Sequence, residues 1–514
     1  MGLLTRDHIR VVNVLITVFV SLGSFTYGYC SAIISTTLGL PQFYEYLHLA
    51  TYGPGLSHTN ALTGAMNGLF QGGGLFGSLA VGPIADKFSR RGSITIAAAI
   101  CLIGGALQTG TVNVAMFLVA RFITGFGAGM ILCSVPLYQS EVSPPHSRGV
   151  LVGIHGIWIC CGYSVAGWVG YGCFYYTTAF QWRFPLGLQC LPPVLLFIGL
   201  RFIPESPRWL CLRDRHDDAY RAIEYLHGDP SDPQQSLAKR EYEAVRKQIE
   251  LDCVKGNGSY KELFTNPANR KRVTIGFLLL FGAQCTATIV IANYGIILYT
   301  GLGYTAPTTL AFTAGWVSVA VAGNTITSLF VDRVGRVRFL LIGFCGCLLA
   351  LVMEMWLLAV YQNSTNKAGQ AAAVSFLYIH VGFYSVCVDA TTYIYCTEIF
   401  PSHLRARGSS VSISGLFFAT VIFTCAAPQA FGDIGWKYYI IFAVLTVMMI
   451  IIMWFYFPET KGLSLEEINA LFGEDVALQA AQFSEEPDST IAVDHVPKKE
   501  VAGITQHKET APDV

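Results

Sequence analysis

The sequence predicts an all-α membrane protein with twelve transmembrane helices in two six-helix halves. Of its 514 residues, 53% are hydrophobic and only 13% are charged, whereas a soluble domain carries roughly 25% charged residues. Apolar runs long enough to span a bilayer occur twelve times, and three charged motifs occur once in each half. This composition excludes a soluble enzyme and a disordered scaffold.

The predicted spans are apolar on all sides, as in membrane helices that pack in a bundle. They lie near residues 11–34, 61–83, 94–112, 114–136, 150–172, 184–203, 273–298, 309–331, 339–361, 373–396, 409–430 and 436–457. We therefore expect an N-terminal half over 1–203, a loop over 204–270, a C-terminal half over 271–461 and a tail over 462–514.

The loop and the tail differ from the spans in charge. The loop carries mixed charge and is predicted to form two short amphipathic helices, Asp217 to His227 and Pro233 to Leu251. The tail holds eleven Asp and Glu against three Lys, a composition typical of a disordered segment.

Basic residues of the short loops lie mostly on one side of the predicted membrane. That side carries Lys87, Arg90, Arg91, Arg148, Arg333, Arg336, Arg338, Arg405 and Arg407, and the other carries Arg183, Lys367 and Lys437. The positive-inside rule predicts that the first side is cytoplasmic. An even number of spans then places both termini in the cytoplasm. The sequon at Asn363 lies outside, where it is a predicted glycosylation site.

Three motifs recur in the same order in both halves. The stretch from Gly77 to Arg90 resembles that from Gly323 to Arg336, and the other pairs are Glu141…Arg148 with Glu398…Arg405 and Pro204-Glu205 with Pro458-Glu459. This repetition indicates two six-helix halves of common plan.

The repeated charges lie at helix ends on the predicted cytoplasmic side. We interpret them as a latch whose ion pairs form in one conformation and break in another; the alternative is that they only anchor the topology. The residues are Asp86, Arg90, Arg91, Glu141, Arg148, Asp332, Arg336, Glu398 and Arg405.

Three ionisable residues lie inside apolar runs, namely Arg121, Glu354 and Asp389. Such residues are functional candidates by default. Asp389 lies deepest, close in sequence to Tyr393, and is expected either to line a cavity or to be a core group. The fifteen cysteines are scattered and form no CxxC pair, so we expect no metal centre and no cofactor. A net charge of zero excludes nucleic acid as a partner.

A resemblance to a known family rests on three stretches. They are Ile123-x-Gly125-Phe126-x-Ala128-Gly129 with Tyr138, Glu141 and Arg148; Pro204-Glu205-Ser206-Pro207-Arg208-Trp209-Leu210; and Pro458-Glu459-Thr460-Lys461-Gly462. They resemble the signature motifs of the sugar porter family of the major facilitator superfamily, and Asn293-Tyr294 resembles its fungal members. The resemblance implies two six-helix bundles, a solute site between them and alternating access. It also implies that Glu205, Arg208 and Glu459 join the gate.

The chain departs from the family at the solute and proton sites. Cys30 stands where proton-coupled members carry an acid that pairs with the arginine matching Arg121, and several sugar-binding amides are replaced, with Gln284 retained. Each lost hydrogen-bond partner costs a sugar about 1 kcal/mol. The predicted substrate-binding residues are Gln284, Tyr393, Phe418, Trp158, Arg121 and Asn293.

The predicted function is secondary transport of a small organic solute, with a sugar or polyol as the family default. One alternative is a non-sugar such as a secondary metabolite or a quinate-like ring acid, with Arg121 as its counter-charge. Another is a nutrient sensor that binds without transport. Uniport fits the loss of the first-helix acid, and proton coupling through Asp389 or Glu354 is the rival. We expect a monomer in the plasma membrane, with lipid, solute and, for coupled transport, protons as its partners.

Overall fold

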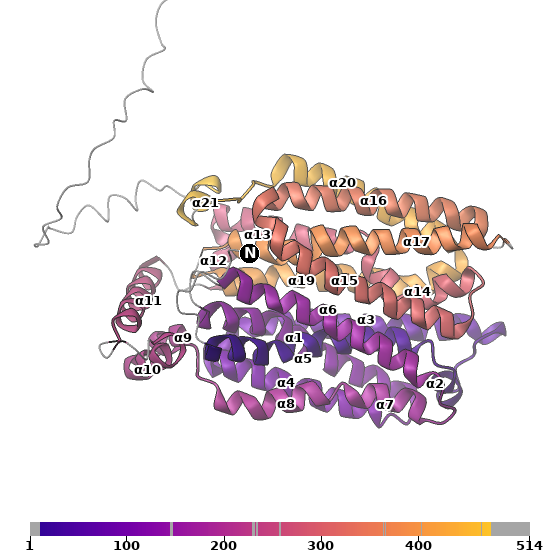
Figure 1. The fold of residues 1–514 in the computed structure, drawn as a ribbon, viewed down its shortest axis with the longest axis horizontal. Coiled ribbons are helices and arrows are strands. Elements are labelled where there is room, and N and C mark those ends of the chain that lie inside the picture. The colour runs from indigo at the N-terminus through magenta and orange to yellow at the C-terminus, as the bar shows by residue number, and fades with distance from the viewer. Residues whose placement is uncertain are drawn as a thin grey trace, which may run out of the picture.

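Two groups of long helices lie side by side in the computed structural model, and both run along its long axis (Figure 1). The structure describes residues 11–143, 148–228, 232, 235–255, 259–362, 364, 366–401, 403–463 and 465–473. These residues form helices and no strands. Ten helices or helix pairs among them are long and apolar enough to cross a membrane, and α3 and α6 run beside these helices. The predicted fold of twelve helices in two bundles is confirmed.

The first bundle, the N-half, contains six spans. They are α1 (Val11–Thr37), α3 (Leu56–Phe88), α4 (Arg90–Thr109), α5 (Val114–Val142), α6 (Arg148–Cys173) and the pair α7 (Phe180–Leu188) and α8 (Leu191–Gly199). A short helix, α2 (Pro41–Tyr46), and a 3-10 turn at Gly53–Gly55 connect α1 to α3.

The second bundle, the C-half, repeats this plan. Its spans are α13 (Pro267–Gln284) with α14 (Thr288–Gly301), α15 (Ala306–Val334), α16 (Arg336–Tyr361), α17 (Lys367–Phe383) with η3 (Tyr384–Asp389) and α18 (Ala390–Glu398), α19 (Arg405–Asp433) and α20 (Tyr438–Tyr456).

Three spans that the sequence predicts as continuous are interrupted. The sixth breaks between α7 and α8, where two prolines begin the second helix. The seventh breaks before α14, because Ala287 adopts a left-handed conformation with φ of 67°. The tenth widens into a π-helical segment over η3. A hydropathy profile reads only composition and length, so these breaks leave no signal in it.

Glycines allow α3 and α5 to pack with their backbones in contact. A Cβ atom on Gly77 would lie 2.0 Å from the carbonyl oxygen of Phe126, and one on Gly125 would lie 2.0 Å from that of Phe70. Real Cβ atoms essentially never approach backbone this closely, so both positions require glycine. Gly77 and Gly125 therefore serve close packing within the N-half.

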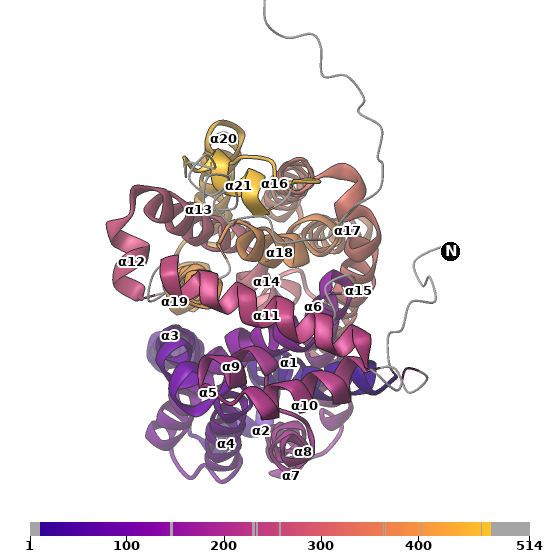
Figure 2. The ribbon, with the colours of Figure 1, turned by 90° about the vertical axis from the view of Figure 1, so that its left-hand side faces the viewer.

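The two halves meet along two seams, one between α3 and α19 and one between α6 and α15. Viewed from one end, the N-half lies below the C-half and α11 (Ser236–Lys255) crosses their boundary (Figure 2). A Cβ on Gly64 of α3 would lie 2.5 Å from the carbonyl oxygen of Cys425 in α19. The first seam is therefore as tightly packed as the interior of either half.

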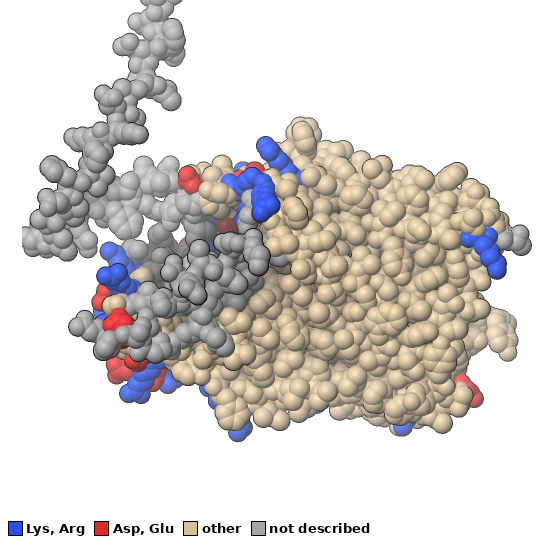
Figure 3. Space-filling model, viewed as in Figure 1, with Lys and Arg blue, Asp and Glu red and all other residues tan. Residues whose placement is uncertain are grey.

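One end of the molecule carries most of the visible charge (Figure 3). This charged end holds α9 (Pro207–Leu212), α10 (His216–His227), α11, α12 (Tyr260–Thr265) and α21 (Leu465–Leu471). The structure contains both helices predicted for the loop, as α10 and α11, and adds α9 and α12. The predicted glycosylation site Asn363 and the tail beyond residue 473 lie outside the described residues.

Candidate functional site

A cavity of about 90 Å³ lies between the two halves. Its lining comes from both of them, which makes it the natural place for a ligand that both halves contact. The N-half contributes Tyr27, Gln71, Cys160 and Tyr163, and the C-half contributes Gln284, Asn293, Trp316, Tyr384, Asp389 and Tyr393, among others.

The halves touch on both sides of this cavity. Toward the end opposite the charged end, the amide of Asn67 donates to the hydroxyl of Tyr294 at 2.9 Å, and the hydroxyls of Ser164 and Ser318 lie 2.7 Å apart. Toward the charged end, the hydroxyl of Ser410 donates to the carbonyl of Ser78.

Asp389 is the carboxylate of this cavity, and two neutral groups hold it. The amide Nδ2 of Asn324 donates to its Oδ2 at 2.8 Å, and the Cys160 thiol lies 3.7 Å from the same oxygen. Asn324 and Asp389 belong to the C-half and Cys160 to the N-half, so the thiol contact joins the halves. Asp389 accepts no bond from a cation among the described residues.

The π-helical segment that ends at Asp389 is held open from the neighbouring helix. The hydroxyl of Thr327 in α15 donates to the carbonyls of Ser385, at 3.0 Å, and Val386, at 2.6 Å. Widening a helical turn disturbs the regular backbone bonds, and the Thr327 hydroxyl supplies a donor at this point. A Cβ on Gly323 would lie 2.0 Å from the Ser385 hydroxyl, so α15 approaches the wide turn closely. These contacts fix the position of Asp389.

Three predicted substrate-binding residues line the cavity, namely Gln284, Asn293 and Tyr393. Each amide uses one of its two N–H donors within the protein, because Gln284 Nε2 donates to the hydroxyl of Tyr384 at 3.3 Å and Asn293 Nδ2 donates to the carbonyl of Ile289 at 2.9 Å. Each amide therefore keeps one N–H that a ligand can use.

Two predicted aromatic residues lie elsewhere. Phe418 is 46% exposed and packs beside Phe277 and Phe281 on the outer surface of the C-half. Its buried neighbour Phe417 faces the N-half, where its ring packs on Tyr27. Trp158 packs against Phe25 at a centroid separation of 6.1 Å and is not among the lining residues. The residues of α19 that line the cavity are Leu416 and Thr420, and Phe418 points away from them because each helical residue turns the side chain by about 100°.

Arg121 is buried in the N-half and does not line the cavity. Its Nε donates to the carbonyl of Met66 and its Nη1 to the carbonyl of Cys30, both at 3.1 Å, and its guanidinium lies 4.3 Å from the ring centroid of Phe70. Because the first helix carries no acid, backbone carbonyls accept the hydrogen bonds that the Arg121 guanidinium donates. The predicted role as a counter-charge for an anionic solute therefore has no geometric support.

Glu354, the second candidate proton carrier, lies away from the cavity lining. It is 1% exposed within α16, and neither carboxylate oxygen has a hydrogen-bond partner among the described residues. The hydroxyls of Tyr299 and Tyr439, which lie within electrostatic range of it, also lack partners there. This cluster lies inside the C-half.

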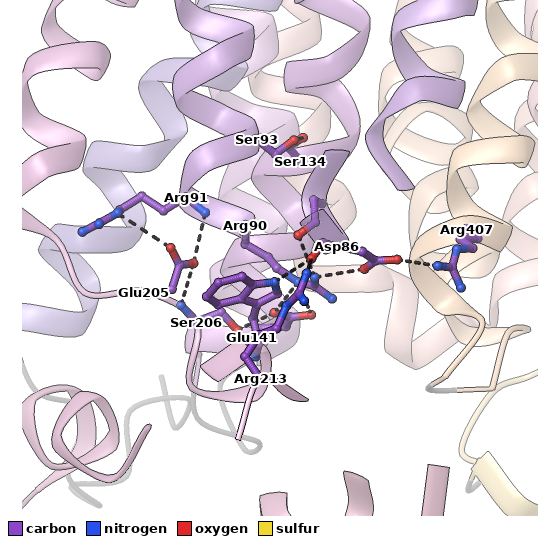
Figure 4. A network of polar contacts seen from close by, with 12 residues as sticks. Asp86, Arg90, Arg91, Ser93, Ser134, Glu141, Glu205, Ser206, Arg213 and Arg407 are labelled. Carbon is purple, nitrogen blue, oxygen red and sulfur yellow. Dashed lines mark hydrogen bonds and ion pairs between the residues drawn. The ribbon is translucent and has the colours of Figure 1, made fainter. Parts of the chain in front are cut away.

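The predicted gate residues of the N-half form one network at the charged end (Figure 4). Arg90 pairs with Asp86 and with Glu141, each at 3.1 Å. Ser206 donates to Glu141 at 2.5 Å, and Glu205 accepts the backbone N–H of Arg91 at 3.1 Å. The network ties the ends of α3, α4, α5 and α9 together.

The C-half repeats this network with matching residues. Arg336 pairs with Glu398 at 2.9 Å, Thr460 donates to Glu398 at 2.7 Å, and Glu459 accepts the backbone N–H of Arg336 at 2.8 Å. The tyrosines also match, since Tyr138 donates to the carbonyl of Pro204 at 2.7 Å and Tyr395 to that of Pro458 at 2.9 Å. The repeated motifs thus build the same bonds twice.

One ion pair of this network crosses between the halves, that of Asp86 in α3 with Arg407 in α19 (Figure 4). Arg407 also lies over the ring of Tyr260, 5.8 Å from its centroid. Arg208 and Arg405 lie in α9 and at the start of α19, and the side chains of Arg148 and Asp332 lie outside what the structure describes.

Sequence reasoning missed Asn324, which holds Asp389. It lies four residues after Ala320, which lines the cavity, and residues four apart share one helix face. A single asparagine inside an apolar span was the available signal. The aromatic lining residues Tyr27, Trp316 and Tyr384 lie in spans rich in aromatic residues and had no such signal.

The family description "Sugar (and other) transporter" matches residues 16–472. The chain belongs to this family. The family consists of transporters and not of enzymes. The sugar transporter relatives include MFS-type transporter criB of Aspergillus cristatus, 30% identical over 91% of this chain and 95% of that protein. A quinate permease of Neurospora terricola is 30% identical over 88% and 87% of the two chains.

A solved structure shares the fold of this sugar transporter family member. It is the proton:xylose symporter XylE bound to 6-bromo-6-deoxy-D-glucose, which matches with a TM-score of 0.74 at 22% identity over 90% of this chain and 99% of that chain. The match establishes the arrangement of the helices. The chain is thus a multi-pass membrane transporter of the major facilitator type.

Proposed function

We propose that the protein is a secondary carrier that moves a small organic solute through the central cavity by alternating access. One observation carries this proposal: residues of both halves line the cavity, and the halves touch on either side of it through contacts that rigid-body rocking can break. Asn67 with Tyr294 lies on one side, and Asp86 with Arg407 on the other.

The lining favours a solute less polar than a sugar. A sugar is bound by many hydroxyl contacts, and each unmade bond in a buried site costs about 1 kcal/mol. Gln284 and Asn293 each use one of two amide N–H donors within the protein, and five aromatic side chains contribute to the wall. We therefore rank a non-sugar solute with an apolar or aromatic body above the family default of a sugar or polyol.

A ring acid is disfavoured by the same geometry. The cavity contains the carboxylate of Asp389, while Arg121 is held in the N-half by two backbone carbonyls. An anionic solute would meet like charge and no counter-charge in a site of low dielectric constant.

Asp389 is the better candidate for proton coupling, because it lines the path of the solute and Glu354 does not. The test is a proton gradient across proteoliposomes. Accumulation of solute that ends in Asp389→Asn supports coupling through this residue. Equal concentrations on both sides under the gradient support uniport.

We further propose that the charged end faces the cytoplasm, with both termini on that side, in the plasma membrane and as a monomer. The support is the excess of Lys and Arg in the short loops of the charged end. Labelling of Lys87 in intact cells tests the orientation: protection from an impermeant reagent agrees with it, and labelling contradicts it. A glycosidase-sensitive mobility shift lost in Asn363→Gln tests the predicted glycan.

The experiment that tests the carrier itself is solute flux into proteoliposomes that contain the purified protein. Sugars, polyols, ring acids and aromatic metabolites are compared, with protein-free vesicles as the control. Net flux of any of them supports a carrier. Binding without flux supports the nutrient sensor instead.

A further inference from the structure

The charge of the central cavity indicates the chemical class of its solute. Among the described lining residues, Asp389 is the only side chain that is a carboxylate, and none is Lys, Arg or His. Its contacts with Asn324 and Cys160 are made by neutral groups. Neutral donors stabilise a carboxylate but leave its charge uncompensated, and a buried carboxylate is balanced either by a proton or by a cation.

Three oxygen atoms, on Gln71, Asn324 and Asp389, accept no hydrogen bond from the described residues. Gln71 lines the cavity, is 2% exposed, and its Oε1 has no partner among the described residues. Asn324 is also 2% exposed, and its Oδ1 has none there either. Both bonds that Asp389 accepts reach Oδ2, and Oδ1 accepts none from the described residues. A solute that satisfies these atoms must bring donors.

Aromatic rings also line the cavity. Tyr27, Tyr163, Tyr384, Tyr393 and Trp316 all line the cavity, and the four tyrosines lie within electrostatic range of Asp389. The faces of such rings attract cations, by about 2 kcal/mol or more when the pair is removed from water. They also bind an apolar body by ordinary burial.

We propose that the cavity selects a small organic cation, an amine or amidine group on an apolar or aromatic body, with Asp389 as its counter-ion. This inference rests on the proposed carrier function and names the class of solute that the carrier would move. An ammonium or amidinium group has only donors to offer, which matches the unpaired acceptors. A sugar offers donors and acceptors in similar number, and a carboxylate offers acceptors alone.

The test uses three molecules of almost the same shape, namely benzamidine (a cation), benzamide (neutral) and benzoate (an anion). Their dissociation constants are measured by titration of the purified protein in detergent. We expect benzamidine to bind at least about tenfold more tightly than benzamide, a factor that corresponds to about 1.4 kcal/mol, and benzoate to bind most weakly. Equal binding of benzamidine and benzamide, or tighter binding of benzoate, overturns the inference.

Variants assign the preference to Asp389. Asp389→Asn keeps the shape of the side chain and is expected to bring the benzamidine-to-benzamide ratio close to one, and Asp389→Glu to retain most of it. Asp433→Asn, which neutralises an exposed carboxylate at the end of α19, serves as the matched control. A ratio unchanged in Asp389→Asn overturns the assignment. If this variant does not fold, the wild-type series and Asp389→Glu still decide.

Flux separates this inference from the carrier proposal. Proteoliposomes that take up glucose or benzamide as readily as benzamidine contradict the cation class and leave the carrier standing. Proteoliposomes that pass nothing, although the protein binds benzamidine, contradict the carrier and leave the site standing.

Discussion

Arg407→Gln is expected to loosen the charged end of the molecule. The substitution removes the ion pair between Asp86 and Arg407 that joins α3 to α19, together with the contact of Arg407 with the ring of Tyr260. It leaves the pair of Asp86 with Arg90 intact. The conformation with this end closed loses stability, and the population with it open rises.

The free energy that the Asp86–Arg407 pair contributes depends on how far its two side chains are exposed to solvent. The side chain of Asp86 is 43% exposed and that of Arg407 21% exposed, so the pair contributes about 0.2–1 kcal/mol. The contact with Tyr260 adds up to about 1 kcal/mol at such a site. The ratio of open to closed protein should therefore rise by a factor between about 1.4 and about 30.

Amide hydrogen exchange followed by mass spectrometry measures this change. Exchange in the charged-end segments of α3 and α19 should accelerate by the same factor, because it proceeds through the open population. Arg213→Gln is the matched control, since Arg213 donates at 2.7 Å to the carbonyl of Asp86 within the same half. Unchanged exchange in Arg407→Gln, or equal acceleration in Arg213→Gln, refutes the reasoning.

Three further predictions follow from the packing. Gly64→Ala places a Cβ 2.5 Å from a backbone carbonyl of α19, which costs about 1–3 kcal/mol in the conformation with the seam closed. Solute flux should therefore fall in Gly64→Ala and stay normal in Gly72→Ala, whose Cβ meets nothing within 4 Å. Equal flux in the two variants contradicts this prediction. Thr327→Val removes the one hydroxyl donor that reaches the carbonyls of η3, a loss of about 0.5–1.5 kcal/mol for one hydrogen bond. It should weaken benzamidine binding more than the exposed Thr325→Val does. An equal or larger effect of Thr325→Val would be evidence against a role of the wide turn in binding. Arg121→Ala removes two hydrogen bonds from a buried guanidinium to carbonyls of α3 and α1, so the free energy of unfolding should fall by at least about 2 kcal/mol. Lost flux at unchanged thermal stability would instead indicate a direct role in transport.

Helices and charge pairs could be predicted from the sequence because their signals are local or repeated. Apolar runs of spanning length locate the twelve spans. The duplicated motifs predicted ion pairs at the helix ends, and the structure pairs Asp86, Glu141 and Glu398 with arginines. These charged residues lie at the ends of helices, and short polar motifs in the sequence predict where helices end.

The cavity lining was harder to predict, because it depends on the rotation of each helix. Phe417 faces the N-half, whereas Phe418, the next residue in the chain, faces outward. Arg121 lies at the depth of the solute site but points into its own bundle. The left-handed conformation of Ala287 is set by tertiary contacts that a single sequence does not display.

The wide turn at η3 also affects how the substrate specificity of such a carrier can change. A turn that holds one extra residue shifts every following side chain by about 100° around the helix axis. A single inserted or deleted residue in this stretch can thus change which side chain faces the solute. The two ends of the span keep their positions in the membrane. Directed evolution of specificity in this scaffold should accordingly sample length as well as identity between Tyr384 and Asp389.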